Sequence, residues 1–287
     1  MITHTHQENP ERSISQLCET LQVSRSWYYE KQSRPEVTET DVELRDAIEG
    51  IILEFAGYGY RRVTYALKRV GWIVNHKRVL RIMREECLLC HLKRHFVHTT
   101  DSQHPYQVYP NLVKGMTIAA PNMVWVADLT YIRLPSSFVY LAAILDAYSR
   151  KCIGWKLSPR IDTQLALGAL EAALATREIK AGLIHHSDRG VQYASHEYVA
   201  RLQSIEAHVS MSAVGNPYDN AKAESFFKTL KREEVYLKQY HTLQEAEDNI
   251  REFIEEVYNS KRLHSSLGYL PPTEFEEAFS SVRESSL

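Results

Sequence analysis

Three acidic residues of this chain, Asp128, Asp188 and Glu224, have the residue type and spacing to bind metal ions for phosphoryl transfer. Fifty-nine residues separate the first two, and 35 separate the second from the third. Asp128 interrupts an apolar run, Asp188 ends a second one, and Glu224 opens a helical stretch. Hard divalent cations prefer oxygen ligands, and two-metal sites hold their ions about 4 Å apart. Carboxylates from a strand, a strand end and a helix can converge on such ions, so we predict that all three are catalytic and metal-binding.

Each acid taken alone also has a structural interpretation. Asp128 could form a buried salt bridge with an arginine, Asp188 could belong to an Asp-Arg-Gly turn, and Glu224 could lie on a helix surface. A carboxylate inside a buried strand must be paired or bind a metal, which favours the metal site when the three acids are considered together. A fourth acid, Asp146, is expected to pair with Arg150 or another arginine.

Long sequence motifs surround the three acids. In chain order they are Trp125-x-x-Asp-Leu-Thr-Tyr131, His186-Ser-Asp-Arg-Gly-x-Gln-Tyr193 and Gly215-Asn-Pro-Tyr-Asp-Asn-Ala-x-Ala-Glu-Ser225. A fourth motif runs from Tyr258 to Phe275 through Arg262 and His264. Together they resemble the DDE transposases of bacterial insertion sequences, and above all the second open reading frame (OrfB) product of the insertion-sequence-three family. The resemblance extends from about residue 14 to residue 280, which is nearly the whole chain.

The resemblance implies a retroviral-integrase-like catalytic domain that cleaves transposon-end strands and joins the 3′-OH strand to target DNA in insertion-sequence movement. It implies two Mg²⁺ ions per active site, with Mn²⁺ able to substitute, held by the three acids. The implied partners are double-stranded DNA, both transposon ends and target, and further copies of the chain assembled on it. The resemblance also implies an upstream-frame protein, or a frameshift fusion to it, which in the family supplies end-specific binding and a leucine zipper. This chain has no sustained heptad run of its own.

Two lysines follow Glu224 on what we predict to be one helix face. Glu224, Lys228 and Lys231 are spaced at i, i+4 and i+7. This spacing predicts two cations beside the acids, along the path of bound DNA. The alternative is an ordinary surface pair between Glu224 and Lys228, which contributes only about a few tenths of a kcal/mol. In related integrases a lysine seven positions after the glutamate contacts terminal bases, so the resemblance makes Lys231 the candidate for that contact.

Four other residues each have two possible roles. Asn220 precedes the predicted helix and could cap it or contact DNA. His186 stands two residues before Asp188 and could orient water or phosphate, or have a structural role. Cys87 and Cys90 resemble half of a zinc site, but the nearby histidines are irregularly spaced, and their order differs from that of zinc-binding integrases. The sequence disfavours zinc there without excluding it.

Composition bounds the class of protein. The 287 residues are 44% hydrophobic, which supports a real core. No apolar run approaches the length of a membrane span, and the first 30 residues lack a signal-peptide core. We therefore expect no membrane association and a bacterial cytoplasmic, nucleoid-associated location. Four cysteines do not suggest a disulfide framework.

Positive charge is concentrated between residues 57 and 98, although the whole chain has a net charge of −2. This segment has ten Lys and Arg residues and two acids, a local charge of +8. Solvated helix faces usually mix signs, so we predict contact with DNA phosphates. The candidate contacts, expected on the outside of the helices, are Arg61, Arg62, Lys77, Arg78 and Arg81.

The pattern of hydrophobic residues predicts two small all-α modules followed by an α/β domain. Three strands in hairpin order, then alternating helices and strands, are the order of a ribonuclease-H-like fold with a mixed five-stranded sheet. The first module has helix-turn-helix spacing, with an ordinary helical hairpin as the alternative. The predicted segments are 1–40 (helix-turn-helix), 41–98 (basic DNA-binding module), 99–116 (linker), 117–236 (catalytic domain) and 237–287 (C-terminal helix and tail).

Two other functions compete with transposition. A DNA-binding regulator could retain a dead catalytic fold, but such a domain has no reason to keep all three acids. A ribonuclease-H-like nuclease could hydrolyse without joining, but the long basic N-terminal half and the Pro-rich tail exceed what a minimal nuclease needs. We therefore predict a polynucleotidyl transferase of the DDE type.

Overall fold

The computed structural model describes residues 11–32, 39–90, 106–179, 181–212 and 220–284. Part of the predicted linker, the first part of the motif that begins at Gly215, and the histidines near Cys90 lie outside these ranges. No helix within the described ranges is both long and apolar enough to cross a membrane.

A mixed five-stranded sheet forms the centre of the C-terminal domain, as the sequence predicts. The strands lie in the order β3-β2-β1-β4-β5, in which β1, β2 and β3 are antiparallel and β4 and β5 run parallel to β1. This is the predicted ribonuclease-H-like arrangement. The bounds are β1 Val124–Arg133, β2 Phe138–Asp146, β3 Cys152–Ser158, β4 Ile184–Ser187 and β5 His208–Met211.

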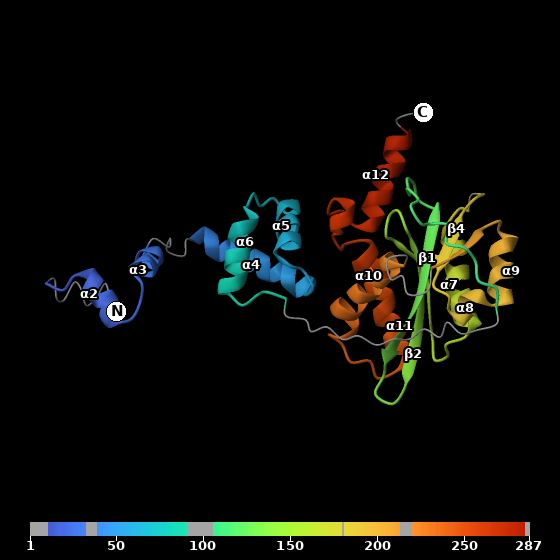
Figure 1. Cartoon of the computed structure of the whole chain (residues 1–287), viewed down its shortest axis with the longest axis horizontal. Coiled ribbons are helices and arrows are strands. Elements are labelled where there is room, and N and C mark those ends of the chain that lie inside the picture. The colour runs from blue at the N-terminus through green and yellow to red at the C-terminus, as the bar shows by residue number, and fades with distance from the viewer. Residues whose placement is uncertain (1–10, 33–38, 91–105, 180, 213–219, 285–287) are drawn as a thin grey trace.

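Helices cover both faces of this sheet (Figure 1). Alternate residues of β1 enter two separate cores, as the period of a strand requires: Val124 and Val126 pack toward α10 and α11, and Trp125 and Ala127 pack toward α7 and α9. Gly154 of β3 lets α7 approach closely, because a Cβ there would overlap the backbone of α7. The bounds are α7 Thr163–Thr176, α8 Val191–Ala194, α9 His196–Ser204, α10 Ala221–Leu230 and α11 Leu243–Glu252.

The N-terminal part contains two helical modules in succession (Figure 1). The first consists of α2 Ile14–Thr20, which starts with a capping box between Ser13 and Gln16, and α3 Arg25–Gln32. The second, which we call the helical module, has its own apolar core, and the Asn75 side chain caps its last helix by accepting from the Lys77 N–H. Its helices are α4 Glu39–Glu54, α5 Tyr60–Arg69 and α6 His76–Glu85.

The tail after α11 joins the helical module to the catalytic domain. Leu263 is 3% exposed and completes the core of the helical module. The Leu263 N–H donates to the Tyr58 hydroxyl at 2.7 Å, and Arg62 Nε donates to the Leu263 carbonyl at 3.1 Å. The rings of Tyr65 and Tyr269 stack with centroids 3.7 Å apart. We call this contact region the junction.

Two of the C-terminal helices continue into π-helical segments. α10 is followed by the π-helical segment Lys231–Val235, and α11 by a second one, Phe253–Asn259. A short 3-10 turn, Ser265–Leu267, precedes the last helix, α12 Pro272–Glu284, which has 13 residues.

Candidate active site

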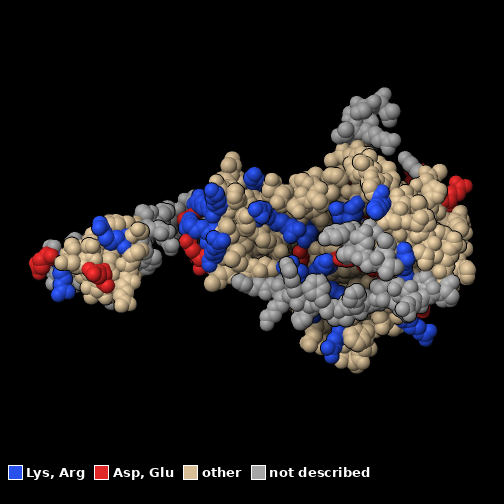
Figure 2. Space-filling view, viewed as in Figure 1, with Lys and Arg blue, Asp and Glu red and all other residues tan. Residues whose placement is uncertain are grey.

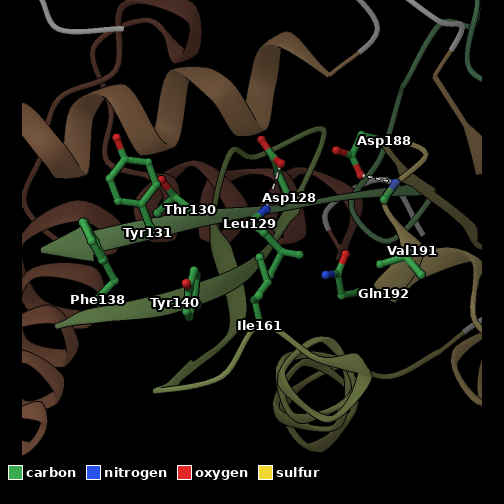
Figure 3. A pocket seen from close by; sticks show the side chains of 11 residues that line it. Asp128, Leu129, Thr130, Tyr131, Phe138, Tyr140, Ile161, Asp188, Val191 and Gln192 are labelled. Carbon is green, nitrogen blue, oxygen red and sulfur yellow. Dashed lines mark hydrogen bonds between the residues drawn. The ribbon is translucent and has the colours of Figure 1, made fainter. Parts of the chain in front are cut away.

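The fold brings the three candidate acids to one edge of the sheet. Val126 of β1 is in register with His186 of the parallel strand β4. Asp128, two residues further along β1, and Asp188, the residue that follows the end of β4, are therefore neighbours. Figure 3 shows both carboxylates rising at the same end of a pocket. Glu224 comes from the first turn of α10, which crosses this edge.

Electrostatics show that the acids interact. Burial raises the pKa of Asp128 to about 8, and repulsion from Asp188 and Glu224 adds to this rise. The Leu129 N–H, which donates to Asp128 Oδ1 at 2.8 Å, and the nearby Lys231 act in the opposite direction. A carboxylate disfavoured by neighbouring carboxylates is one that a cation would stabilise.

Local contacts hold the other two acids. The Gly190 N–H donates to Asp188 Oδ1 at 2.9 Å, and a Cβ at Gly190 would lie 2.9 Å from the same oxygen. This close approach explains the glycine two residues after Asp188. Glu224 accepts a hydrogen bond from Lys228 Nζ at 3.2 Å, in a pair that is largely exposed.

The donor set fits a hard divalent cation, although the side chains do not enclose one. Among the described residues, no three acidic, histidine or cysteine side chains surround a common point. Glu224 is turned to Lys228 instead. All three candidates are carboxylates, the ligands that Mg²⁺ and Mn²⁺ prefer. The pKa of Asp128 is raised first by burial and then by Asp188 and Glu224, so a cation bound between these acids would stabilise the ionised carboxylate.

Lys231 lies beside the acids even though the regular helix ends one residue earlier. Its Nζ is 4.4 Å from the centroid of the Tyr131 ring, a cation–π contact. Burial lowers the pKa of Lys231, and attraction to Asp128 opposes that change. The expected position next to the acids is therefore found, whereas Lys228 extends into solvent beside Glu224.

The two supporting candidates have structural contacts. Asn220 Nδ2 donates to the carbonyl of Ala127 at 3.2 Å and so ties the start of α10 to β1, but its side chain makes no cap hydrogen bond. His186 is fully buried, with Nδ1 2.8 Å from the Ser210 hydroxyl and Nε2 3.1 Å from the Ser212 hydroxyl. Both ring nitrogens of His186 are therefore engaged inside the fold, which favours its structural interpretation.

Not all of the basic candidates face solvent. Arg62, expected outside, is held in the junction, and its guanidinium lies 5.7 Å from the centroid of the Tyr58 ring. The expectation of an outward Arg62 is wrong because its hydrogen-bond acceptor, the Leu263 carbonyl, comes from a distant part of the chain.

Two further candidates, Arg78 and Arg81, share one acid. Both pair with the buried Asp41, at 2.5 and 3.0 Å. Burial tends to raise the pKa of Asp41, but hydrogen bonds from these arginines lower it overall. Arg61 and Lys77 remain exposed, and no described carboxylate pairs with either. Figure 2 shows Lys and Arg gathered over the helical module and along the face toward the catalytic domain.

The prediction for Asp146 is wrong. Its carboxylate accepts backbone N–H bonds from Asn122 at 2.6 Å, Tyr148 at 2.8 Å and Ser149 at 3.1 Å. Within the described ranges no arginine pairs with it. Backbone donors take the place of the expected guanidinium.

Cys87 and Cys90 are free thiols on or near the surface. Arg232 donates to Cys90 Sγ at 3.6 Å. The described residues form no zinc site around them.

A pocket of 440 Å³ adjoins Asp128 and Asp188 (Figure 3). Sequence reasoning did not identify its other lining residues as part of a site, although Leu129, Tyr131 and Gln192 stand inside the motifs around the acids. Their position inside those motifs is the sequence signal that could have identified them as part of the site.

Comparison with known proteins gives matches along most of the chain. Residues 119–217 and 206–272 match two families described as integrase core domains, and residues 39–96, the helical module, match an HTH-like domain. The chain is 40% identical over 268 residues to the insertion element IS600 uncharacterized 31 kDa protein of Shigella sonnei, covering 92% of this chain and 98% of that one.

Two further similarities are found, one to a named transposase and one to a solved structure. Over 273 residues the chain is 36% identical to transposase InsF for insertion sequence IS3A of Escherichia coli (strain K12), covering 93% and 94% of the two chains. Among solved structures, the catalytic core domain of BIV integrase is similar with a TM-score of 0.42 and 15% identity, covering 57% of this chain and 99% of that one.

Proposed function

The chain belongs to the IS3 family of insertion-sequence transposases, and we propose that it cleaves and joins DNA strands through Asp128, Asp188 and Glu224. In this role it is a polynucleotidyl transferase that cuts at the ends of a transposable element and transfers the resulting 3′-OH strand to a target. The observation that carries the proposal is the convergence of the three motif acids at one edge of the sheet, set by the parallel register of β1 and β4 and by the first turn of α10. The pKa of Asp128, raised to about 8 by burial and then by the two other carboxylates, supports it.

The three carboxylates are proposed to hold two divalent ions, Mg²⁺ or, as a substitute, Mn²⁺. When bound, such ions supply charge stabilisation to the attacking and leaving oxygens of the phosphoryl group. Asp128 lies in β1, Asp188 directly after the adjacent strand β4, and Glu224 in α10, so the sheet and the helix both position the ligands. Glu224 has to exchange its contact with Lys228 for a metal, which frees Lys228 for a DNA phosphate.

Double-stranded DNA is the proposed partner, bound by separate parts of the chain. Lys228 and Lys231 would contact the transposon end near the carboxylates, and exposed cations of the helical module, Arg61 and Lys77 first, would contact phosphates. Arg78 and Arg81 would contribute a weaker field because Asp41 neutralises part of their charge. Arg62 would act indirectly, by holding the junction.

The division of the chain and its assembly are proposed on the same basis. Residues 1–40 and 41–98 are proposed as DNA-binding modules, 99–116 as a linker, 117–236 as the catalytic domain and 237–287 as the tail. An element has two ends that must be processed together, which favours several copies of the chain on DNA, with an upstream-frame protein or fusion as a further partner. Because DNA is the proposed substrate, we propose the bacterial nucleoid as the location of the protein.

The test is strand cleavage and joining on a duplex that carries an end of the element's flanking inverted repeat, with Mg²⁺. Asp188→Asn should abolish both products while DNA affinity is kept. Asp248→Asn, the same change at an exposed acid of α11 that is 56% exposed, is the matched control and should behave as wild type. Normal joining by Asp188→Asn would overturn the assignment, and wild-type cleavage without joining would point to a hydrolytic nuclease.

A further inference from the structure

An apolar and aromatic hollow adjoins the carboxylates, and phosphate chemistry alone does not account for it. The pocket that holds Asp128 and Asp188 continues along β1 and β2 (Figure 3). Phe138 is 47% exposed, Ile161 40% and Val191 36%, so this part of the pocket leaves apolar surface in water. Its lining residues are Leu129, Tyr131, Phe138, Tyr140, Ile161 and Val191.

The hollow has an aromatic wall, and a cation contacts one of its rings. The Phe138 and Tyr131 rings meet edge to face, with centroids 5.6 Å apart. Lys231 Nζ lies 4.4 Å from the centroid of Tyr131. A nucleotide has the matching parts, since its base is a flat aromatic group and its phosphate is an anion.

We propose that this aromatic part of the pocket receives one nucleobase that leaves the DNA stack beside the phosphate being cleaved. The inference rests on the proposed function and adds a base-binding subsite to it. The volume is in the range of sites for single small ligands. Paired bases show only their edges in the grooves, so a base reaches the ring faces only after unstacking, which costs least for unpaired or terminal bases.

A base held here would position the phosphate accurately, because the wall and the carboxylate share one strand. Leu129 follows Asp128 directly in β1, and its N–H donates to the Asp128 carboxylate at 2.8 Å. Tyr131 is three residues from Asp128 on the same strand and is in register with Tyr140 of β2. Groups on a rigid sheet keep a bound substrate in a reactive geometry better than groups on separate loops.

The experiment is a double-mutant cycle in which one change is made in the protein and the other in the DNA, and it uses the full chain. A base beside the scissile phosphate is replaced by an abasic sugar, one position at a time, in the end duplex used above. Wild type is compared with Phe138→Ser, with the aromatic Phe138→Tyr and with Ile161→Ser. Leu53→Ser is the matched control, because Leu53 is 87% exposed on α4, outside the pocket.

At one position in the DNA, the effects of the protein substitution and of the missing base on cleavage should not be additive. The cleavage rate of wild type should fall roughly tenfold or more on the abasic duplex, as expected for one lost stacked base. Phe138→Ser should lose a similar factor on intact DNA and nothing more on abasic DNA, Ile161→Ser should lose a smaller factor with the same pattern, and Phe138→Tyr should retain wild-type behaviour.

Additive losses at every position, or a Phe138→Ser protein that equals wild type on intact DNA, would overturn the subsite. An apolar segment of another protein in the hollow would give additive losses, because it does not sense the missing base. If wild type binds the duplex and cleaves none of it, the proposed function fails. The same cycle, measured on dissociation constants, then decides the subsite separately.

Discussion

The junction and the carboxylate site differ in how their charges are matched. At the junction, Arg262 donates two hydrogen bonds to Glu233, at 2.6 and 2.8 Å, and both side chains are nearly buried. At the carboxylate site, Asp128 faces two further acids and accepts a single backbone hydrogen bond, from Leu129, within the described structure. A matched pair inside the fold stabilises its geometry, whereas acids that repel one another at a pocket are typical of a site that receives a cation.

Two aspartates on adjacent strands show the same difference at closer range. Asp146 of β2 is completely buried, and three backbone N–H groups donate to its carboxylate. Asp128 of β1 is half-buried beside the pocket and is repelled by Asp188 and Glu224. Burial raises the pKa of both, but only Asp146 has several donors that oppose the rise. The number of hydrogen-bond donors to its carboxylate therefore distinguishes a structural aspartate in a strand from a candidate functional one.

The largest expected effect follows from replacing Asp128 with Asn. Cleavage should fall by about a thousandfold or more, because a metal ligand contributes several kcal/mol to the transition state. The metal-free protein should unfold at equal or higher urea concentration, because the amide removes a charge that burial, and then repulsion from Asp188 and Glu224, disfavours enough to raise the pKa of Asp128 to about 8. Cleavage rates and urea unfolding curves measure the two effects.

Asp146→Asn is the counterpart and should give the opposite result. An amide NH₂ would face a backbone N–H, which costs about 1–3 kcal/mol of unfolding free energy. The protein that remains folded should cleave at the wild-type rate. A folded Asp146→Asn protein without activity would contradict a purely structural role for Asp146.

The matched pair at the junction is the next test, with stability as its main readout. Arg262→Met leaves Glu233 buried and unpaired, so the unfolding free energy should fall by about 3–5 kcal/mol. The double variant Arg262→Met with Glu233→Gln should recover most of this loss, because no buried charge remains. Thermal and urea unfolding of the two variants decide this. Equal losses in both would mean that packing, rather than charge matching, holds the junction.

These contacts also mark where prediction from sequence succeeds and fails. The central strands and helices of the module were predictable because hydrophobic period and the Asn75 cap are local signals. The junction was not, because Tyr58 and Leu263 are 205 positions apart. The outward placement predicted for Arg62 failed for the same reason. The groups that donate to Asp146 are backbone N–H groups, which every non-proline residue has, so no residue type in the sequence predicts these hydrogen bonds.

The acids themselves were identifiable because their motifs are long and contain several unusual residues. Their mutual geometry follows from the parallel register of β1 and β4. The pocket beside them was not predicted, since its wall combines β1, β2 and the segment that contains Ile161. The end of α10 at Leu230, before Lys231, was also missed, because the change to a π-helical segment has no local sequence signal here.

A smaller effect is expected from pH, through a histidine buried at the junction. Burial, reinforced by Arg262 and Arg62, lowers the pKa of His264 to about 3. Below a pH of about 6.5 the unfolded chain gains a proton that folded His264 does not, so stability should fall by up to about 1.4 kcal/mol per pH unit from this residue, down to about pH 3. At pH 8 the histidine is neutral in both states, and this contribution vanishes.

His264→Phe tests this effect and keeps a ring against Tyr258, which lies edge to face with His264 at 4.8 Å. The unfolding free energy of the variant should depend less steeply on pH between 6.5 and 4 than that of wild type. An unchanged slope would show that His264 is protonated in the folded protein and that its surroundings match a charge after all.

The smallest expected effect concerns matched and unmatched cations on the helical module. Arg61 and Lys77 are exposed and have no described carboxylate partner, whereas Arg78 and Arg81 share Asp41. Each phosphate contact that is lost should reduce the slope of log affinity against log salt by about 0.9. Arg61→Ala with Lys77→Ala should therefore flatten the salt dependence of DNA binding more than Arg78→Ala with Arg81→Ala.

The double variant Arg78→Ala with Arg81→Ala should instead lower stability, because Asp41 is left buried without its arginines. Binding measured over a series of salt concentrations separates the two outcomes: equal slopes would mean that the pairing with Asp41 does not reduce the contribution of these arginines to DNA binding.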